Sequence, residues 1–538
     1  YMTALENAFA EWIQLLGAAQ VLDGEAAQRE RGQDASGIER RLPGLLKITA
    51  ADSVPEVMKI ANRHGIPVYP FSTGFNWGYG SALPVKDDCV LLDLSGLRRI
   101  IDFDAELGVV TLEPGVTQAQ LAEFLDAGNH PFLVPVTGAG PQCSLVGNAL
   151  ERGYGVTPIV DHFGAVTDLE AVLADGSVYR TALREAAGDE LARLFKWGIG
   201  PYSAGLFTQG NFGIVTRMTL ILAQRPECVK VCLFSLKDDA LLEPAVEAIR
   251  SILANLPGTV GAINLMNQHR VLAMSAPFPR DQLDAEGLIP KSLIQSLGRQ
   301  YQIFPWTGFG TLYGTQRVVK AAQKEIRQRL SGIASRLMFL TPDNAKTLAK
   351  LTRLIPGPIG QRLSGSTTML AKSLELVAGR PNETALPLTY WRNPNPPKGA
   401  LMNPSTDGCG LIWYAPLVPM RAKSVRSYVE MIHKVAHEYR IEPLITFTTV
   451  SDKIFDSTVP LIFERANPEA VRAATNCYGA LLKQGREIGC FPYRVSVDTM
   501  AKLVDLESSA RSFHQTIKMA LDPSDLIAPG RYVPTLPR

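Results

Sequence analysis

A glycine-rich loop at residues 70–80 (PFSTGFNWGYG) constrains this chain more than any other feature. It follows an apolar run with helix-like spacing at 54–66 and precedes a strand-like run at 90–94. Glycine permits positive φ and close backbone approach, so such a loop can present several N–H groups to one anion. The loop predicts a diphosphate cradle, and its Tyr79 indicates that a substrate also comes close. Taken alone, the same residues fit an ordinary tight connection equally well.

The sequence disfavours two common nucleotide-binding loops. The chain has no Gly-x4-Gly-Lys-Ser/Thr motif, which disfavours a P-loop nucleotidase. It also lacks a Gly-x-Gly-x-x-Gly motif between an N-terminal strand and a helix, which disfavours a Rossmann dinucleotide site.

Composition narrows the class of protein. A chain of 538 residues with 46% hydrophobic and 20% charged residues is long enough for two or more globular domains. The net charge of +2 does not indicate a nucleic-acid partner, and no apolar run predicts a membrane span. No signal peptide is recognisable, so we expect a cytoplasmic protein, or a periplasmic one if an upstream signal was removed. The seven cysteines and seven histidines are scattered, which predicts reduced thiols and no metal site.

The order of strands and helices predicts the fold class. Strand-like runs mix with amphipathic helices, as at 241–254 and 318–330, without strict βαβ alternation, which favours an α+β fold. The region 355–403 is rich in Pro, Gly, Asn and Ser and predicts long loops.

Further patches follow the first loop in a definite order. Together they resemble the flavoprotein family of vanillyl-alcohol oxidase and p-cresol methylhydroxylase, and they extend over almost the whole chain. The matching stretches are residues 72–74 (STG) with Asn76, 78–80 (GYG), 147–153 (GNALERG), 157–158 (TP), 161–163 (DHF), 205–209 (GLFTQ), 213–216 (GIVT), 492–494 (PYR), 521–523 (LDP) and 528–531 (APGR).

The resemblance implies a two-domain, PCMH-type FAD-binding fold. The FAD-binding domain would comprise residues 1–225 plus 491–538, and an α+β cap domain over the flavin would comprise 226–490. It also implies a set of cofactor-binding residues. These are Pro70, Ser72, Thr73, Gly74, Asn76, Gly78, Pro141, Ser144, Leu145, Gly147, Asn148, Arg152, Gly153, Thr157, Gly213, Ile214, Val215 and Arg531.

The family reaction oxidises the carbon para to a phenol hydroxyl, through a quinone methide. By resemblance, Tyr79, Tyr493 and Arg494 would bind the phenolate, because a fixed guanidinium and two hydroxyls stabilise that anion in a dry site. Asp161 would lie near the flavin and act as a base for water. The same residues also suit structural roles, Asp161 as a turn former and the others as packing.

Two departures from the family are visible. The methylhydroxylases carry a glutamate and a His-His pair in a cap segment that here reads 445–457 (ITFTTVSDKIFDS) and has neither. Asp452 or Asp456 could replace the glutamate, and a substrate other than p-cresol or vanillyl alcohol is expected. Relatives that bond the flavin use a His or Tyr where this chain has Leu411 or Asn403, so we expect non-covalent FAD, with Tyr390 as the remaining candidate for attachment.

The main expectation is an FAD-dependent oxidase or dehydrogenase of a 4-alkylphenol, a small aromatic substrate of aromatic catabolism. The first alternative is oxidation of a non-phenolic alcohol or hydroxy acid, with Arg494 binding a carboxylate. The second is a non-catalytic flavin protein or a subunit that needs a cytochrome. The sequence leaves the electron acceptor open between oxygen and a cytochrome or other carrier, and the resemblance implies a homodimer.

Overall fold

The first loop leaves a small sheet at the end of a strand that follows helix α3 (Val54–His64). This helix has a proline in its first turn, buries Val57 and Met58 on its apolar face, and ends at Gly65 with a φ of +65°. Strand β3 (Val68–Phe71) follows and runs parallel to β4 (Val90–Asp93), so the loop leaves the end of β3 as expected. The other elements of this layer are α1 (Met2–Leu16), β1 (Val21–Asp23), α2 (Gly24–Arg31) and β2 (Gly44–Lys47).

The structure is a computed structural model that describes residues 2–503 and 508–534. Residues 504–507 and 535–538, which the predicted FAD-binding domain includes, lie outside the described residues, as does Tyr1. None of the seven cysteines, all within the described part, forms a disulfide. No helix in that part is both long and apolar enough to cross a membrane.

A second sheet of antiparallel strands lies beside the first. Its strand order is β5-β6-β10-β8-β9, and residues 174–176 lie in the connection between the paired strands β8 and β9. The strands of this sheet and the elements around it are β5 (Ile100–Asp104), β6 (Val109–Leu112), α4 (Gln118–Ala127), β7 (Phe132–Leu133), α5 (Leu145–Leu150), β8 (Val166–Val172), β9 (Val178–Arg180), α6 (Ala182–Ala187), α7 (Asp189–Ala192), β10 (Ile214–Ile221) and β11 (Ala223–Gln224). Strands β7 and β11 pair with each other in a separate two-stranded sheet.

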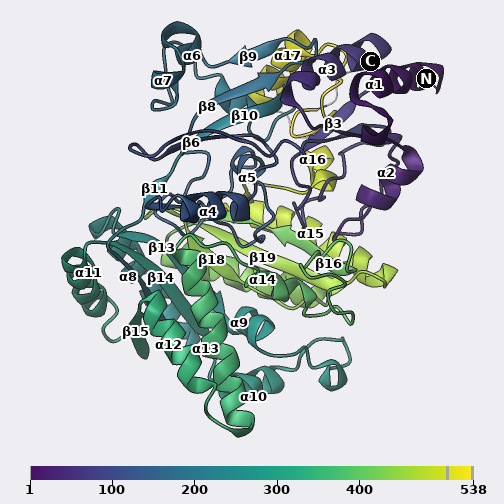
Figure 1. Ribbon diagram of the computed structural model, residues 1–538. Coiled ribbons are helices and arrows are strands. Elements are labelled where there is room, and N and C mark those ends of the chain that lie inside the picture. The colour runs from purple at the N-terminus through teal and green to yellow at the C-terminus, as the bar shows by residue number, and fades with distance from the viewer. Residues whose placement is uncertain (1, 504–507, 535–538) are drawn as a thin grey trace.

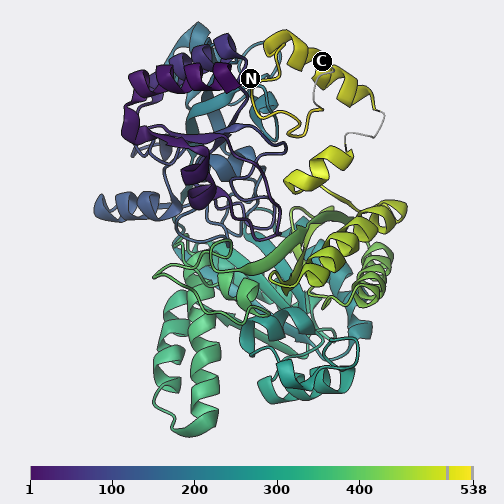
Figure 2. The ribbon, with the colours of Figure 1, turned by 90° about the vertical axis from the view of Figure 1, so that its right-hand side faces the viewer.

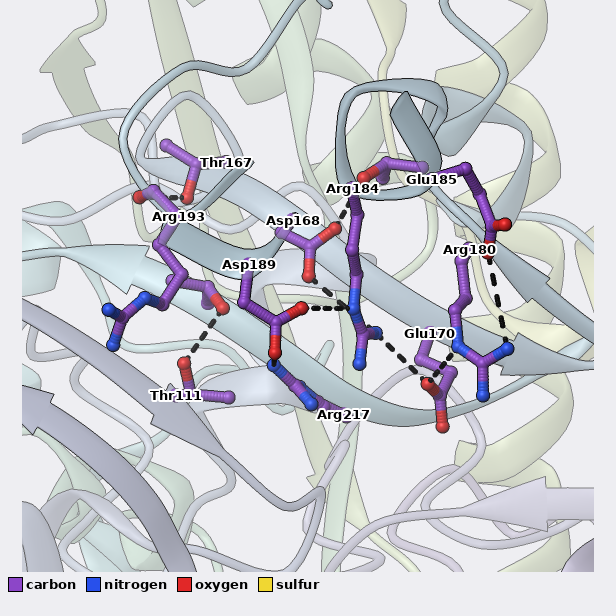
Figure 3. A network of polar contacts seen from close by, with 12 residues as sticks. Thr111, Thr167, Asp168, Glu170, Arg180, Arg184, Glu185, Asp189, Arg193 and Arg217 are labelled. Carbon is purple, nitrogen blue, oxygen red and sulfur yellow. Dashed lines mark hydrogen bonds and ion pairs between the residues drawn. The ribbon is translucent and has the colours of Figure 1, made fainter. Parts of the chain in front are cut away.

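A network of ion pairs fastens helices α6 and α7 to this second sheet (Figure 3). Arg184 donates to Asp189 at 2.6 Å and to Glu170 of β8 at 3.0 Å. Arg184 also lies 3.9 Å from Asp168, which is buried and accepts a hydrogen bond from Thr181. Arginines of the same layer form ion pairs with these carboxylates. We therefore infer that the network stabilises the fold and is not part of a functional site.

A large antiparallel sheet forms the other half of the molecule, below the first two in Figure 1. Helices α8, α11, α14 and α15 pack their apolar sides on one of its faces and build the largest core. The elements are β12 (Cys228–Leu236), α8 (Leu242–Asn255), β13 (Val260–Asn267), α9 (Gln268–Ser275), α10 (Lys291–Tyr301), β14 (Trp306–Gly314), α11 (Gln316–Arg329), β15 (Arg336–Leu340), β16 (Cys409–Tyr414), β17 (Pro416–Pro419), α14 (Ala422–Glu438), β18 (Thr446–Thr449), β19 (Ile454–Glu464), α15 (Pro468–Glu487) and β20 (Phe491–Pro492).

The register of this sheet decides which side chains leave the helix-covered core. Asn264 of β13 is opposite Thr448 of β18, which is opposite Asp456 of β19. Side chains of directly opposed residues share a face, whereas their neighbours Phe447 and Phe455 are fully buried in the core on the other face. The row through Asp456 therefore faces away from the helices.

The prediction of long loops over 355–403 is wrong for its first part. Residues 357–377 form a long helix, α13 (Gly357–Val377), which packs beside α12 (Pro342–Thr352) rather than forming a loop. Its Thr367 bonds back to the carbonyl of Leu363, four residues earlier, so the polar residues satisfy themselves within the helix. Tertiary packing on the far side of the sheet overrides the loop-like composition.

The chain returns to its first half at the end. Strand β20 pairs with β17 of the large sheet, and helices α16 (Val497–Leu503) and α17 (Ser509–Leu521) then lie with the N-terminal elements, as Figures 1 and 2 show. Val68 of β3 accepts a hydrogen bond from Ala528 at 2.8 Å, which ties the tail to the first sheet. The architecture is α+β; the boundaries 1–225, 226–490 and 491–538 stay a prediction.

Candidate active site

The first loop is fixed by contacts that only glycine permits. Gly78 has a φ of +77°, and a Cβ there would lie 2.4 Å from Cδ1 of Trp413 on β16. Gly80 has a φ of +116°, and a Cβ would lie 2.6 Å from Cγ2 of Val497 on α16. Between them, Tyr79 is buried and its carbonyl accepts a hydrogen bond from Val497 at 3.0 Å. The loop is thus held between the large sheet and the returning tail, which aims Tyr79 inward.

The second predicted cofactor segment touches this loop. Ser144 caps helix α5: its Oγ accepts from the Gly147 N–H at 2.9 Å and donates to the Pro114 carbonyl at 2.6 Å. A Cβ at Gly147 would lie 2.4 Å from Oγ of Ser72. Gly147 has no side chain at the point where the two segments meet. They therefore form one surface of small residues, on which a ligand can come close to the protein backbone.

The other predicted cofactor residues are partly occupied by protein. Arg152 donates to Thr208 Oγ1 through Nε at 3.1 Å and Nη2 at 3.0 Å, and Arg531 donates to the Tyr69 hydroxyl at 2.7 Å. The remaining predicted cofactor residues belong to three segments of the chain. Pro70, Thr73, Gly74 and Asn76 belong to β3 and the first loop, Pro141, Leu145, Asn148, Gly153 and Thr157 to the second, and Gly213, Ile214 and Val215 to the start of β10.

The structure brings together three of the four predicted catalytic residues. The guanidinium carbon of Arg494 lies 4.2 Å from the centroid of the Tyr79 ring, and its Nη2 donates to Asn76 Oδ1. Tyr493 is anchored by its carbonyl, which accepts from Gln209 Nε2 at 3.0 Å. Burial raises the pKa of both tyrosines, so they remain protonated hydroxyl donors. Together they can hold an oxyanion.

Asp456 completes this group and is absent from the predicted catalytic set. It is 6% exposed, and its Oδ1 has no hydrogen-bond partner in the described part of the chain. Burial raises the pKa of Asp456 to about 7, although Arg494 and a hydrogen bond with Tyr493 act in the lowering direction. The sequence offered Asp452 and Asp456 as alternatives; Asp452 is instead paired with the exposed Lys453.

Glu151 is a second residue that the site predictions missed, although it lies inside the 147–153 stretch. Its carboxylate forms an ion pair with Arg531 and lies 3.8 Å from Nε of Arg494. One carboxylate between two arginines leaves a net positive charge when Asp456 is protonated. The site therefore suits an anion.

Asp161 lies outside this group. Its side chain is exposed and accepts a hydrogen bond from the Gly164 N–H at 2.9 Å, which organises a turn. Its backbone pairs with Tyr154, whose ring lies edge-on to Tyr493 with centroids 5.5 Å apart. The catalytic role of Asp161 stays a prediction.

The residues present fit an FAD. Two buried ring nitrogens next to the glycine surface, Nε1 of Trp77 and Nε2 of His162, lack hydrogen-bond partners among the described residues. Burial lowers the pKa of His162 to about 4, so this ring is neutral and can meet a polar cofactor atom. Buried polar atoms without protein partners are uncommon in native structures, and a bound polar ligand accounts for them.

Comparisons with known proteins agree with this geometry. The family described as FAD binding domain matches residues 43–182. The chain is 33% identical to the 1'-carboxy-chondrochloren decarboxylase of Chondromyces crocatus, over 98% of this chain and 97% of that protein. It is 31% identical to the flavoprotein subunit of the hydroxylating 4-cresol dehydrogenase of Pseudomonas putida, over 90% and 86%. The crystal structure of substrate-bound p-cresol methylhydroxylase superimposes with a TM-score of 0.87 at 27% identity, over 99% and 98%.

Fold and site thus define an FAD-dependent oxidoreductase with a PCMH-type FAD-binding fold. The chain belongs to the vanillyl-alcohol oxidase and p-cresol methylhydroxylase family of flavoproteins.

The candidate attachment residues have protein contacts of their own, and non-covalent binding of the FAD stays a prediction. The Tyr390 hydroxyl donates to Asp407 Oδ2 at 2.5 Å, and burial raises the pKa of Tyr390, so the free side chain is a neutral phenol. Leu411 packs against the first loop, where a Cβ at Gly78 would lie 3.1 Å from its Cγ. Leucine at this place carries no group that could form the bond.

Proposed function

We propose that this enzyme oxidises the para-benzylic carbon of a 4-substituted phenol. The observation that carries the proposal is the convergence of Arg494, Tyr79, Tyr493 and Asp456 from three separate parts of the chain. Such a cluster binds an oxyanion and can also receive the proton that a phenol must lose.

Each residue has a defined task in this proposal. Asp456 takes up the phenol proton through the Tyr493 hydroxyl, because its pKa of about 7 allows it to hold that proton. Arg494 then balances the phenolate charge, and Tyr79 donates a hydrogen bond to the same oxygen. Bound FAD supplies the acceptor for the hydride of the para carbon. A phenolate loses that hydride more readily than a phenol, since its negative charge passes into a neutral quinone methide.

Hydration of the quinone methide would fall to Asp161. Its exposed carboxylate, linked to the phenolate cluster through Tyr154 and Tyr493, can accept a proton from the attacking water. The hydroxylated or further oxidised phenol would then leave.

A second candidate keeps the same oxidation but ends in loss of carbon dioxide. The relative named as a decarboxylase supports it, as does Arg270, a cap arginine with two buried nitrogens that lack partners among the described residues. When a carboxylate sits one carbon beyond the para-benzylic carbon, the C–COO⁻ bond breaks after hydride loss. Its electron pair forms the side-chain double bond, and the ring oxygen recovers its negative charge. Atoms and charge balance as a vinylphenolate plus carbon dioxide.

Oxidation of a non-phenolic hydroxy acid, with Arg494 as the carboxylate ligand, has less support. A carboxylate is already ionised on arrival, so it needs neither the proton acceptor Asp456 nor its hydrogen bond with Tyr493. The electron acceptor, oxygen or a carrier protein, and the homodimer remain proposals. The Pseudomonas putida relative is by name one subunit of its enzyme, which supports a carrier.

A substrate panel tests the proposal. The flavin-loaded enzyme is mixed anaerobically with 4-ethylphenol, 4-propylphenol and 3-(4-hydroxyphenyl)propanoate across a pH series, and flavin bleaching is followed. We expect reduction by the phenols and none by their O-methyl ethers, which cannot form the phenolate. If no para-substituted phenol reduces the flavin at any pH, the phenol proposal is wrong.

A further inference from the structure

Arg270 is a buried cation with no visible counter-charge among the described residues. It lies on α9, where its backbone N–H bonds to Asn267 Oδ1 at 3.0 Å, and its guanidinium carbon is 5.9 Å from the Trp413 ring centroid. Its Nε and Nη1 atoms are buried without hydrogen-bond partners in that part of the chain. Burial alone lowers the pKa of Arg270 to about 9.

This state is unusual within the same half of the molecule. Arg426 of α14, for comparison, meets two carboxylates, Asp239 at 2.6 Å and Glu243 at 2.7 Å. Removing a guanidinium from water without compensating hydrogen bonds is unfavourable, so such groups are normally paired or coordinate a ligand. The unpaired donors of Arg270 therefore indicate an anion from outside the chain.

The position of Arg270 puts that anion within reach of the substrate. Trp413 donates its backbone N–H to the Gly78 carbonyl at 3.3 Å, so a single residue, Trp413, contacts both Arg270 and the first loop. Trp413 is also opposite Pro460 of β19, on the strand that carries Asp456. The four residues from Asp456 to Pro460 span about 13 Å of strand. A phenol ring with a single para carbon is shorter than this, which leaves room for a side chain.

Two further groups mark the intervening surface as polar. Oδ1 of Asn264 and Oγ1 of Thr446, on β13 and β18, are buried without partners in the described part of the chain. By the sheet register they lie on the same face as Asp456. A substrate bound between Arg494 and Arg270 would thus cross a face that offers hydrogen bonds.

We propose that Arg270 binds a carboxylate on the para side chain of the substrate, so that the site takes a phenol at one end and an acid at the other. The guanidinium fork matches a carboxylate in two parallel hydrogen bonds. The reaction in this inference rests on the proposed phenol oxidation. The anion site itself depends only on the contacts of Arg270.

Binding measurements on the flavin-loaded enzyme test the inference. The probes are 3-(4-hydroxyphenyl)propanoate, its neutral amide, and 3-phenylpropanoate, which has the acid but no phenol; binding is read from the perturbed flavin absorbance. In Arg270→Met we expect the dissociation constant of the two acids to rise about 10- to 100-fold and that of the amide to change less than about threefold. Arg270→Lys should retain part of the preference, because it keeps the charge without the fork.

The matched control is Arg327→Met, which removes a guanidinium that lies 4.8 Å from the Phe339 ring on the far side of the cap. It should leave all three constants unchanged. An equal loss for acid and amide in Arg270→Met, or an altered flavin absorbance or redox potential without selective loss of the acids, would overturn the carboxylate site. If 3-phenylpropanoate binds through Arg270 while no phenol is oxidised, the anion site holds and the proposed function fails.

Discussion

The two surfaces that enclose the candidate site are built by different means. On the flavin side, the loop at 70–80 and the segment 141–153, which contains α5, approach each other and their neighbours because Gly78, Gly80 and Gly147 have no side chain. On the cap side, ordinary strand residues such as Asp456 face the site only because of their register in a sheet. The first surface is specified by local sequence and the second by long-range pairing. Change of substrate between relatives is therefore easiest on the cap side, where no backbone geometry has to be preserved.

We expect the largest effect from substitution of Arg494, which lies between the two surfaces. In Arg494→Met the phenolate loses the guanidinium of the cluster, and we expect kcat/KM for 4-ethylphenol to fall about 1000-fold, or about 4 kcal/mol. Stopped-flow reduction of the flavin by 4-ethylphenol measures this.

Arg494→Lys is the matched variant. It keeps a charge but loses the Asn76 contact and the stacking on Tyr79, so it should recover part of the rate. Full activity in Arg494→Met would show that other residues bind the phenolate. Arg494 would then not be the residue at which the flavin side and the cap side act together.

The next effect isolates the flavin side. Gly78→Ala adds a Cβ to a residue with a φ of +77° and places it 2.4 Å from Trp413. Left-handed backbone strain and overpacking together should lower the free energy of unfolding by about 3 kcal/mol and reduce the flavin bound per chain. Urea denaturation and the ratio of flavin to protein absorbance measure the two quantities.

A matched glycine separates strain from contact. Gly258 has a similar φ of +75°, but a Cβ there would meet no atom of the described residues within 4 Å. Gly258→Ala should therefore lose only about 1 kcal/mol and keep its flavin. Equal losses in the two variants would mean that close approach at Gly78 is unimportant.

The difference between the surfaces also explains how far the sequence could predict this protein. Glycine patterns are local, so the loop at 70–80 and its flanking helix and strands could be predicted from the sequence. The role of the loop in binding the FAD diphosphate rests on the family resemblance and stays a prediction. Tyr79, Tyr493 and Arg494 could be grouped only through a family resemblance, because nothing local brings residues 79 and 494 together. Their proximity in the structure agrees with that grouping.

Asp456, which is absent from the predicted catalytic set, has no local signature. Asp456 sits in a strand among Ile, Phe and Ser, and its importance depends on burial and on Arg494, both of which arise from tertiary contacts. Helix α13 cannot be predicted from composition for a related reason: its glycine and serine content is typical of loops, and its helical state depends on packing against α12 and the sheet.

Asp456 gives a test of the cap side through pH. Its carboxyl has a pKa of about 7 when folded against 3.8 ordinarily, so the folded state binds the proton more tightly and stability falls as pH rises between these values. The shift corresponds to about 4 kcal/mol, and relaxation around the ionised group should halve this to about 2 kcal/mol. Asp456→Asn cannot ionise, so its stability relative to wild type should increase over the same interval, as urea melts across the pH series would show.

Asp452→Asn is the control on the same stretch of chain. Asp452 is paired with exposed Lys453, and the pKa of its carboxyl is lowered by that hydrogen bond, so this variant should not produce a relative gain over the interval in which Asp456 titrates. Parallel pH profiles for wild type and Asp456→Asn would show that Asp456 is not the buried acid described above.

In the last test we expect no change, and it concerns whether the cap is bonded covalently to the flavin. We expect acid precipitation to release all flavin into the supernatant, and Tyr390→Phe to leave that fraction unchanged, because the Tyr390 hydroxyl is committed to Asp407. The variant should lose only the stability of that hydrogen bond, about 1 to 2 kcal/mol, in a urea melt. Flavin in the wild-type pellet that disappears in Tyr390→Phe would identify the tyrosine as the attachment point. It would also mean that the cap is bonded covalently to the flavin. Residue 390 of the cap could then not vary between relatives without loss of that bond.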